Sequence, residues 1–144
     1  MKRVIILSLA LLLMLGFRSS ETTVNWVSLA EAMELTRSNE KPIFIDFTAE
    51  WCGWCKVMDQ KTFTHPDVVS FMNKNFNTVK LDYDSKEKFD FFGETLTARE
   101  IADLYKVPGL PTILLLSADN KKSKRLIGYK KPEPFLNGLK QFVK

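Results

Sequence analysis

Short apolar runs that are typical of strands alternate along the chain with stretches of helical periodicity. Residues 43–47, Ile-Phe-Ile-Asp-Phe, form a β-branched and aromatic run that follows Pro42, and they predict a buried strand. From Gly53 onward, Val57 and Met58 stand among charged residues, which predicts an amphipathic helix. The strand would therefore lead almost directly into a helix.

The same patterns predict the other elements. Ser28 and Glu31 form a capping-box sequence before a helix with one apolar face (Leu29, Ala32, Met33 and Thr36). Thr97 and Glu100 form a second capping box, before a helix in which three side chains should be buried (Ile101, Leu104 and Tyr105). We further expect a helix over 67–76 after a break at 62–66, strands over 77–83, 113–116 and 125–129, a turn at 119–121, and a closing helix over 132–143.

Residues 1–20 have the layout of a secretory signal peptide. Lys2 and Arg3 precede an almost wholly apolar run, 4–15, and mostly small or polar residues, 16–20, follow it. The run is shorter than the ~20 residues that span a bilayer as a helix, and it lacks the polar face of a buried first helix. No small-x-small pair marks a cleavage site, so an uncleaved anchor stays open, whereas the absence of a following cysteine excludes lipidation there. We expect export to the periplasm or another part of the cell envelope.

Length and composition predict one globular domain, which we place at residues 24–144. A chain of 144 residues can close a single hydrophobic core, and no repeat or linker indicates a second domain. The net charge is +4, but residues 1–20 hold three basic residues and no acid, so the remainder carries +1. The other basic residues include a cluster on a predicted hairpin (Lys121, Lys122, Lys124, Arg125, Lys130 and Lys131). A solvated face is favoured there over a site for an anionic partner, and we expect no nucleic-acid partner.

The only two cysteines, Cys52 and Cys55, lie at the predicted junction of strand and helix. A bridge between them would close a very short loop and constrain the unfolded chain little, which argues against a purely structural disulfide. A zinc site takes about four ligands, whereas the chain offers two thiols and one histidine, His65, for which a loop or cap role is favoured over catalysis. A helix N-terminus favours the thiolate. We therefore expect an exposed, easily ionised Cys52 with a more buried Cys55 one turn later.

Two motifs resemble those of the thioredoxin family. Residues 46–56, Asp-Phe-Thr-Ala-Glu-Trp-Cys-Gly-Trp-Cys-Lys, resemble its active-site strand, turn and helix start, and Leu110-Pro111-Thr112 resembles its cis-proline loop. The motifs occur in the family's order, and the similarity runs from about Val24 to the C-terminus. A lone Cys-x-x-Cys also serves metal sites, but the two motifs together are specific. The chain is similar to the C-terminal domain of membrane thiol:disulfide interchange proteins.

The resemblance implies a fold and a reaction. The fold is α/β, a thioredoxin-like three-layer sandwich with a mixed central sheet and helices on both faces. The reaction is thiol–disulfide exchange with Cys52 as nucleophile and Cys55 as resolving thiol, without a metal or other cofactor. Asp46, whose pKa should rise on burial in an apolar strand, would shuttle the proton of the second cysteine, unless it caps a neighbouring turn. Lys80 matches the lysine near that aspartate, with a surface lysine as the alternative.

The resemblance also implies a substrate site around the disulfide. Pro111 would be cis, and the backbone of Leu110 would pair with extended substrate chains. Trp51 would form a flat apolar rim, and Gly53 would allow close approach at the helix start. Trp54 departs from the family, which usually carries proline there. Because residues between the cysteines influence thiolate stability and potential, this departure leaves the direction of electron flow open.

Residues 85–93 form an insertion relative to the minimal fold. Its aromatics, Phe89, Phe91 and Phe92, are expected to pack on the domain rather than form a partner-binding lip. Since Leu110 resembles the aliphatic residue of reducing thioredoxins, we favour a monomeric reductant of protein disulfides that is fed by a membrane donor. An oxidant or isomerase on the same fold and a redox-inert binding module are the alternatives.

Overall fold

A five-stranded mixed sheet forms the middle layer of the computed structural model, which describes residues 21–144. Its strands are β1 (Trp26–Val27), β2 (Ile43–Thr48), β3 (Asn77–Asp82), β6 (Thr112–Leu116) and β7 (Ser123–Ile127). Their order is β1-β3-β2-β6-β7, with β1, β3 and β2 parallel and each later pair antiparallel. The helices are α2 (Leu29–Asn39), α3 (Gly53–Lys61), α4 (Pro66–Asn75), α5 (Ala98–Leu104) and α6 (Pro132–Val143).

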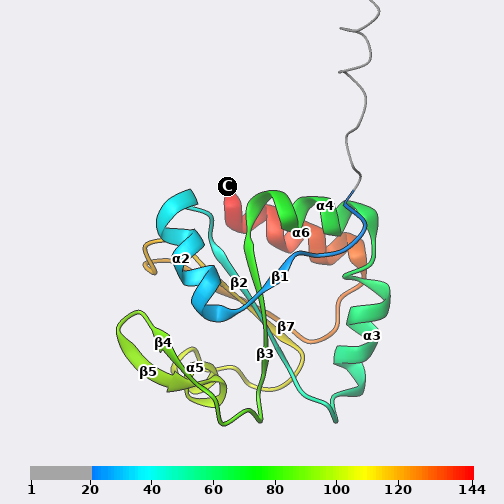
Figure 1. The fold of residues 1–144 in the computed structure, drawn as a ribbon. Coiled ribbons are helices and arrows are strands. Elements are labelled where there is room, and N and C mark those ends of the chain that lie inside the picture. Colours follow the sequence, from blue (N-terminus) through cyan, green and yellow to red (C-terminus); the bar gives the residue numbers. More distant parts are fainter. Residues whose placement is uncertain (1–20) are drawn as a thin grey trace, which may run out of the picture.

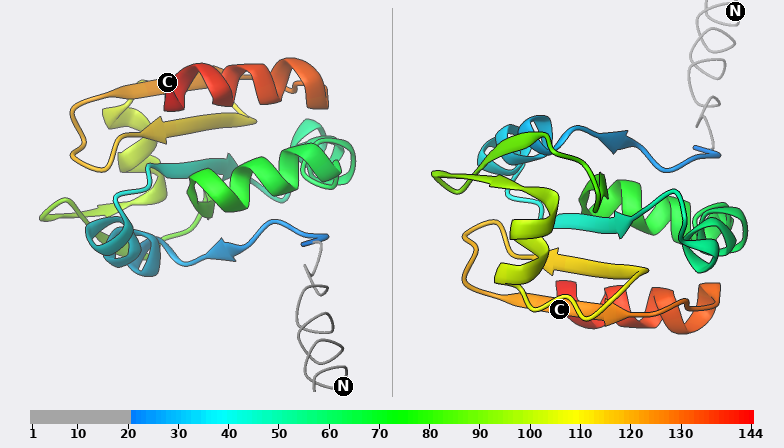
Figure 2. Two further views of the ribbon diagram at one scale, coloured as in Figure 1. Left: turned by 90° about the horizontal axis from the view of Figure 1, so that it is seen from above. Right: turned by 90° about the horizontal axis from the view of Figure 1, so that it is seen from below.

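Helices cover both faces of the sheet, so the predicted three-layer α/β sandwich is confirmed (Figure 1). α2 and α5 pack on one face in a cluster with Ile43, Ile45 and Phe47, while α3, α4 and α6 surround Phe44 on the other. Both views of Figure 2 show α2 and α5 on one side of the strands and α3 and α4 on the opposite side. Strand β2 is covered on both faces, which explains its continuous apolar run.

The predicted elements begin and end within two residues of the observed ones. The break at 62–66 separates two helices, and Pro66 occupies the first turn of α4. Ser28 caps α2 by accepting a hydrogen bond from the Glu31 N–H. Strand β1 was missed because two residues are too short to show a period in the sequence.

The burial predicted for Leu104 is wrong. Its side chain is 57% exposed. The face of α5 that contacts the core instead carries Ala98, Ile101, Ala102 and Tyr105, which follow the i, i+3, i+4, i+7 rule. Leu104 falls between these positions and therefore faces outward.

The insertion forms a two-stranded hairpin, β4 (Lys88–Phe91) and β5 (Glu94–Thr97). Phe92 and Gly93 make the turn with φ of 53° and 89°, and two successive positive values are typical of tight hairpins. Phe91 is buried and Phe89 packs against the same cluster, whereas Phe92 is partly exposed. The insertion therefore packs mainly on its own domain, as expected.

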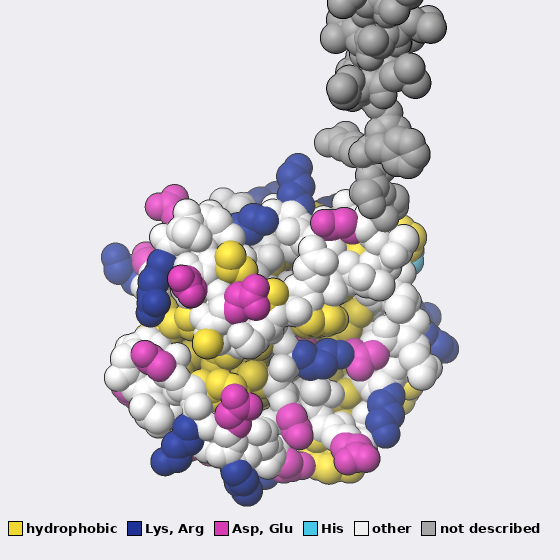
Figure 3. All heavy atoms as spheres, viewed as in Figure 1, with side chains coloured by type: hydrophobic (Ala, Val, Ile, Leu, Met, Phe, Trp, Pro, Cys, Tyr) yellow, Lys and Arg dark blue, Asp and Glu magenta, His cyan; other side chains and the backbone are white. Residues whose placement is uncertain are grey.

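The basic cluster on the β6–β7 hairpin contacts the domain itself. Lys122 Nζ donates to the Phe142 carbonyl at 2.8 Å, and Lys124 Nζ contacts the Gln141 side chain at 3.1 Å, so both reach the end of α6. Arg125 donates to the Lys106 carbonyl. On the face shown in Figure 3, basic and acidic side chains are interspersed, and hydrophobic ones gather between α2 and the β4–β5 hairpin.

Glu21 and Lys144 lie at the same end of the domain, and the strand β2 runs away from them toward the opposite end (Figure 1). Among residues 21–144, no helix is long and apolar enough to span a bilayer. The predicted signal peptide, residues 1–20, lies outside the described residues.

Candidate active site

The two cysteines form a disulfide at the start of α3, where the sequence places them. Cys52 is the N-cap of this helix, and its Sγ accepts a hydrogen bond from the Cys55 N–H at 3.2 Å. The unpaired N–H groups of a helix N-terminus stabilise negative charge, so they favour a thiolate on Cys52 once the bond is reduced.

The expectation that Cys52 is exposed is wrong for this disulfide form. Cys52 is 5% exposed and Cys55 3% exposed. Both pack with Ala49 in a small apolar cluster, and Leu110 lies against it. This packing leaves little of the disulfide open to solvent.

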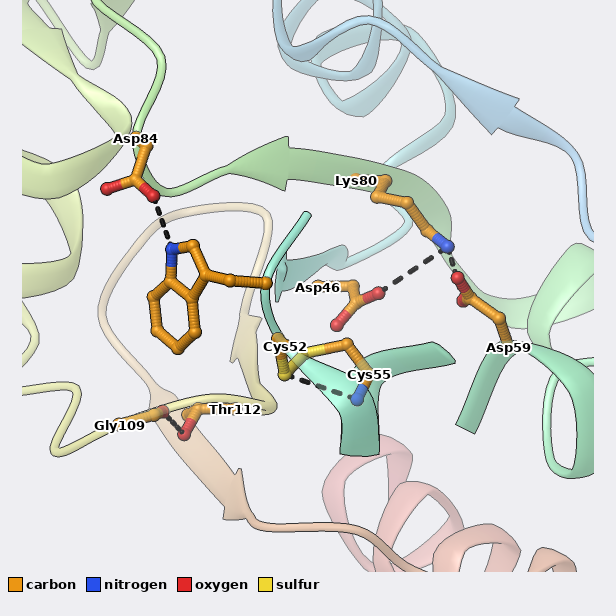
Figure 4. The surroundings of a disulfide bond; sticks show 9 residues. Asp46, Cys52, Cys55, Asp59, Lys80, Asp84, Gly109 and Thr112 are labelled. Atoms are coloured by element: carbon orange, nitrogen blue, oxygen red, sulfur yellow. Dashed lines mark hydrogen bonds and ion pairs between the residues drawn. A yellow bond between two sulfur atoms is a disulfide. The ribbon is translucent and has the colours of Figure 1, made fainter. Parts of the chain in front are cut away.

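Asp46 lies beneath the disulfide, in the interior of β2. It is 2% exposed, and in Figure 4 its carboxyl group points toward the cysteines. Its Oδ1 has no hydrogen-bond partner within the described residues. A buried, unpaired carboxyl oxygen is costly, which indicates a role other than stability.

Two partly exposed charged residues, Lys80 on β3 and Asp59 on α3, lie next to the buried Asp46. Lys80 Nζ lies 3.8 Å from Asp46 Oδ2 and also forms an ion pair with Asp59. Its ammonium lies 4.8 Å from the ring centroid of Trp26 and 5.6 Å from that of Phe63, distances suited to cation–π contact. The lysine therefore lies beside Asp46 rather than extending freely into solvent.

Burial raises the pKa of Asp46 from 3.8 to about 7. The positive charge of Lys80 lowers this pKa, and the negative charge of Asp59 raises it, but both effects are smaller than that of burial. A carboxyl group with a pKa near 7 can both accept and donate a proton at neutral pH.

Trp51 lies beside the disulfide with 68% of its surface exposed, yet its ring is held in place. The indole Nε1 donates to Asp84 Oδ2 at 2.6 Å, and Arg99 Nη2 lies 2.7 Å from the other oxygen of that carboxylate. The Arg99 guanidinium also lies 4.3 Å from the Tyr83 ring centroid. The rim that the sequence predicts is thus fixed by residues after β3 and on α5.

Asp59, Asp84 and Arg99 were not predicted. Parallel neighbours β2 and β3 end at the same edge of the sheet, so Asp84, two residues beyond β3, could have been placed beside Trp51 from the sequence. No comparable sequence signal marks Arg99, because its contact depends on how α5 packs.

The Leu110–Pro111 bond is cis, and this loop adjoins the disulfide. The antiparallel pairing of β2 and β6 sets Thr112 opposite Phe47 and so brings the start of β6 to the end of β2. Thr112 Oγ1 donates to the Gly109 carbonyl at 2.6 Å and closes the loop (Figure 4).

Trp54, Gly53 and His65 were also singled out in the sequence. Trp54, on the first turn of α3, is 61% exposed and stacks on Tyr129. A Cβ added to Gly53 would meet no heavy atom within 4 Å apart from its chain neighbours and the backbone of its own helix, so the packing among residues 21–144 does not require glycine there. His65 is exposed at the N-cap of α4. Across residues 21–144, no three His, Cys, Asp or Glu side chains cluster closely enough to hold a metal ion.

Two relatives are similar in sequence to most of this chain. Disulfide bond reductase DsbH of Chlamydia pneumoniae is 28% identical over 104 residues, which cover 72% of this chain and 62% of that protein. Thiol:disulfide interchange protein DsbD of Actinobacillus pleuropneumoniae serotype 5b (strain L20) is 33% identical over 117 residues, which cover 79% of this chain and 18% of that protein. The chain thus spans less than two thirds of the length of these relatives.

Solved structures show the same fold. A DsbH oxidoreductase matches with a TM-score of 0.71 at 24% identity, over 89% of this chain and 90% of that one. The oxidised C-terminal domain of Neisseria meningitidis DsbD matches with a TM-score of 0.61 at 23% identity, over 78% of this chain and 90% of that one. Residues 29–142 match the family described as Thioredoxin-like domain. Since that match covers most of the chain and includes the Cys52–Cys55 helix start and the cis-proline loop, the protein belongs to the family of thioredoxin-like domains.

Proposed function

We propose that this protein is a thiol–disulfide oxidoreductase that acts on protein substrates. One observation carries the proposal: the Cys52–Cys55 disulfide caps a helix directly above a buried carboxyl group with a pKa of about 7. A structural cross-link would need no such carboxyl group. The relatives named disulfide bond reductase and thiol:disulfide interchange protein support this assignment.

The exchange proceeds in two steps from the reduced form. The Cys52 thiolate attacks one sulfur of the substrate disulfide, which forms a mixed disulfide and releases the other substrate sulfur as a thiolate that takes up a proton. Cys55 then gives its proton to Asp46 and attacks Cys52 Sγ. The mixed disulfide breaks, the second substrate sulfur leaves as a thiolate that takes up a proton, and two electrons have moved from the enzyme to the substrate.

The other residues of the site assist these steps. Lys80 tunes the acidity of Asp46, to which its ammonium is close. The backbone of Leu110 beside cis-Pro111 pairs with the extended substrate chain, while Trp51 and Trp54 form the apolar surroundings of the disulfide. Gly53 leaves room for the substrate at the helix start.

We further propose that the protein acts as a monomeric reductant in the cell envelope, after export by the leader at residues 1–20, and that a membrane donor supplies its electrons. The similarity to a disulfide bond reductase, DsbH, and the aliphatic residue before Pro111 support this direction. A measured Cys52–Cys55 potential tests it, because a strongly oxidising value would identify an oxidant or isomerase instead.

Trapping with Cys55→Ser tests the reaction itself. Without the resolving thiol, the mixed disulfide on Cys52 should accumulate, and envelope proteins should be recovered in disulfide-linked form. The matched control, Cys52→Ser, should trap little, because the attacking thiol is absent. If Cys55→Ser captures no partner and the wild type does not reduce insulin, the proposal is wrong. A cellular effect that survives replacement of both cysteines by serine would instead identify a redox-inert binding module.

A further inference from the structure

Trp54 lies in the apolar surroundings of the disulfide, but Tyr129, on which its ring stacks, has no role in the exchange steps above. The two rings lie 5.3 Å apart between centroids, with 26° between their planes. Trp54 nevertheless remains 61% exposed, so the stack holds the indole without burying it. A large apolar side chain kept both ordered and exposed is typical of a recognition surface.

The contacts of Tyr129 and of its neighbour Gly128 hold this pair in a fixed position. Tyr129 is half-buried and packs against the core on the α6 side of the sheet. It follows Gly128, whose φ of 74° turns the chain and whose N–H donates to the Pro111 carbonyl at 2.9 Å. The tyrosine is therefore tied to the loop proposed to pair with the substrate backbone.

The strand order places this pair on the side of the disulfide opposite the fixed Trp51 ring. β7 runs parallel to β2, through two antiparallel pairings, so β3, β2 and β7 all end at one edge of the sheet. Asp84, which holds Trp51, follows β3 on one side of β2, and Tyr129 follows β7 on the other. A substrate chain lying across the disulfide would thus meet an ordered aromatic ring on each side.

We propose that the Trp54–Tyr129 pair binds a planar aromatic side chain next to the reacting cysteine of the substrate, which makes Tyr129 a specificity-determining residue. The ring already ordered by Tyr129 can stack with a second ring without losing further rotational freedom. An aliphatic side chain of similar size would gain burial but no stacking. This inference rests on the proposed function, and it names the class of substrate: protein segments with an aromatic residue beside the disulfide.

The test compares two disulfide peptides that differ only at the residues flanking one cysteine, phenylalanine in one and leucine in the other. From the usual strength of aromatic pairs, kcat/KM for reduction of the phenylalanine peptide should exceed that of the leucine peptide by about three- to tenfold. In Tyr129→Ala this ratio should fall to about one. The conservative variant Tyr129→Phe should keep it, and so should Phe92→Ala, which removes an exposed aromatic on the distant β4–β5 turn.

The ratio separates selectivity from folding and from redox effects, because both peptides are measured on one enzyme. If Tyr129→Ala does not fold, Trp54→Leu replaces it, since that exposed side chain is not part of the core. A wild-type ratio near one, or a ratio that survives loss of either ring, would overturn the inference while leaving the exchange reaction intact. A wild type that reduces neither peptide would overturn the proposed function and this inference with it.

Discussion

Asp46 has two charged neighbours that act on its pKa in opposite directions. Lys80 stabilises the carboxylate and Asp59 destabilises it, although Lys80 is itself shared with Asp59. The buried carboxyl therefore titrates near neutrality through the balance of a large effect of burial and two smaller effects of charge. A substitution of Lys80 or of Asp59 removes one of these two charge effects and leaves the other.

Lys80→Met should raise the pKa of Asp46 by roughly one unit, because the positive charge that lowers this pKa is lost. Asp59→Asn should lower it, because a negative charge disappears and Lys80 can turn fully toward Asp46. Carboxyl-carbon NMR titration of the oxidised protein measures both shifts. Lys56→Met, an exposed residue of α3, is the control and should leave the titration in place. Shifts of equal sign in the two test variants would contradict this account.

The sequence predicts the positions of some of these residues and not of others. The burial of Asp46 could be predicted because it interrupts an apolar strand, and the cysteines because of their spacing at a strand-to-helix junction. Asp59 could not, because it looks like any other polar residue of an amphipathic helix. The burial of Cys52 was missed because it comes from packing with Ala49, Cys55 and Leu110, which the position of Cys52 at a helix start does not reveal.

At the scale of elements, helix α5 connects the insertion to the rim of the active site. It has only seven residues and begins directly after β5. Its capping box is complete: Thr97 Oγ1 accepts from the Glu100 N–H, and the Glu100 carboxylate accepts from the Thr97 N–H. Arg99, in its first turn, holds the carboxylate that orders Trp51.

Thr97→Ala should lower the free energy of unfolding by about 1 kcal/mol, the usual cost of losing an N-cap side chain. Urea unfolding with an unchanged m-value would measure it. Thr95→Ala, an exposed position on the same strand, is the matched control and should cost less. Equal losses in the two variants would mean that the cap does not stabilise α5.

Elements with strong periodicity were predicted to within two residues, and those without it were missed. The β4–β5 hairpin has a turn formed by Phe92-Gly93, and phenylalanine is not a typical residue for a positive φ. Phe91 and Phe89 pack against the α2 side of the sheet, a tertiary contact that the local sequence of the hairpin does not reveal. The exposure of Leu104 has the same origin, since a short helix leaves several faces compatible with its sequence.

At the scale of the whole molecule, the buried Asp46 makes stability depend on pH. In the folded state the Asp46 carboxyl group keeps its proton up to about pH 7. In the unfolded chain the same group loses its proton near pH 3.8. Between these values the folded state binds more protons, so the free energy of unfolding falls as pH rises, and the full loss is reached above pH 7.

Asp46→Asn should remove this dependence. Between pH 5 and pH 8 the oxidised wild type should lose about 3 kcal/mol that the variant does not lose. Denaturant unfolding at the two pH values measures the difference. Asp119→Asn is the control. Hydrogen bonds from Ser117 and Lys121 lower the pKa of that exposed carboxyl group, so the group is already ionised throughout this pH range. A loss of equal size in Asp46→Asn would show that another group is responsible.

Both ends of the described chain lie away from the disulfide, at the far end of β2 (Figure 1). Coupling the protein to a sensor surface through a linker at Lys144 would therefore leave the cysteines, Trp51, Trp54 and the proline loop facing the solution. Client capture on such a chip would report the reactive face undisturbed by the attachment.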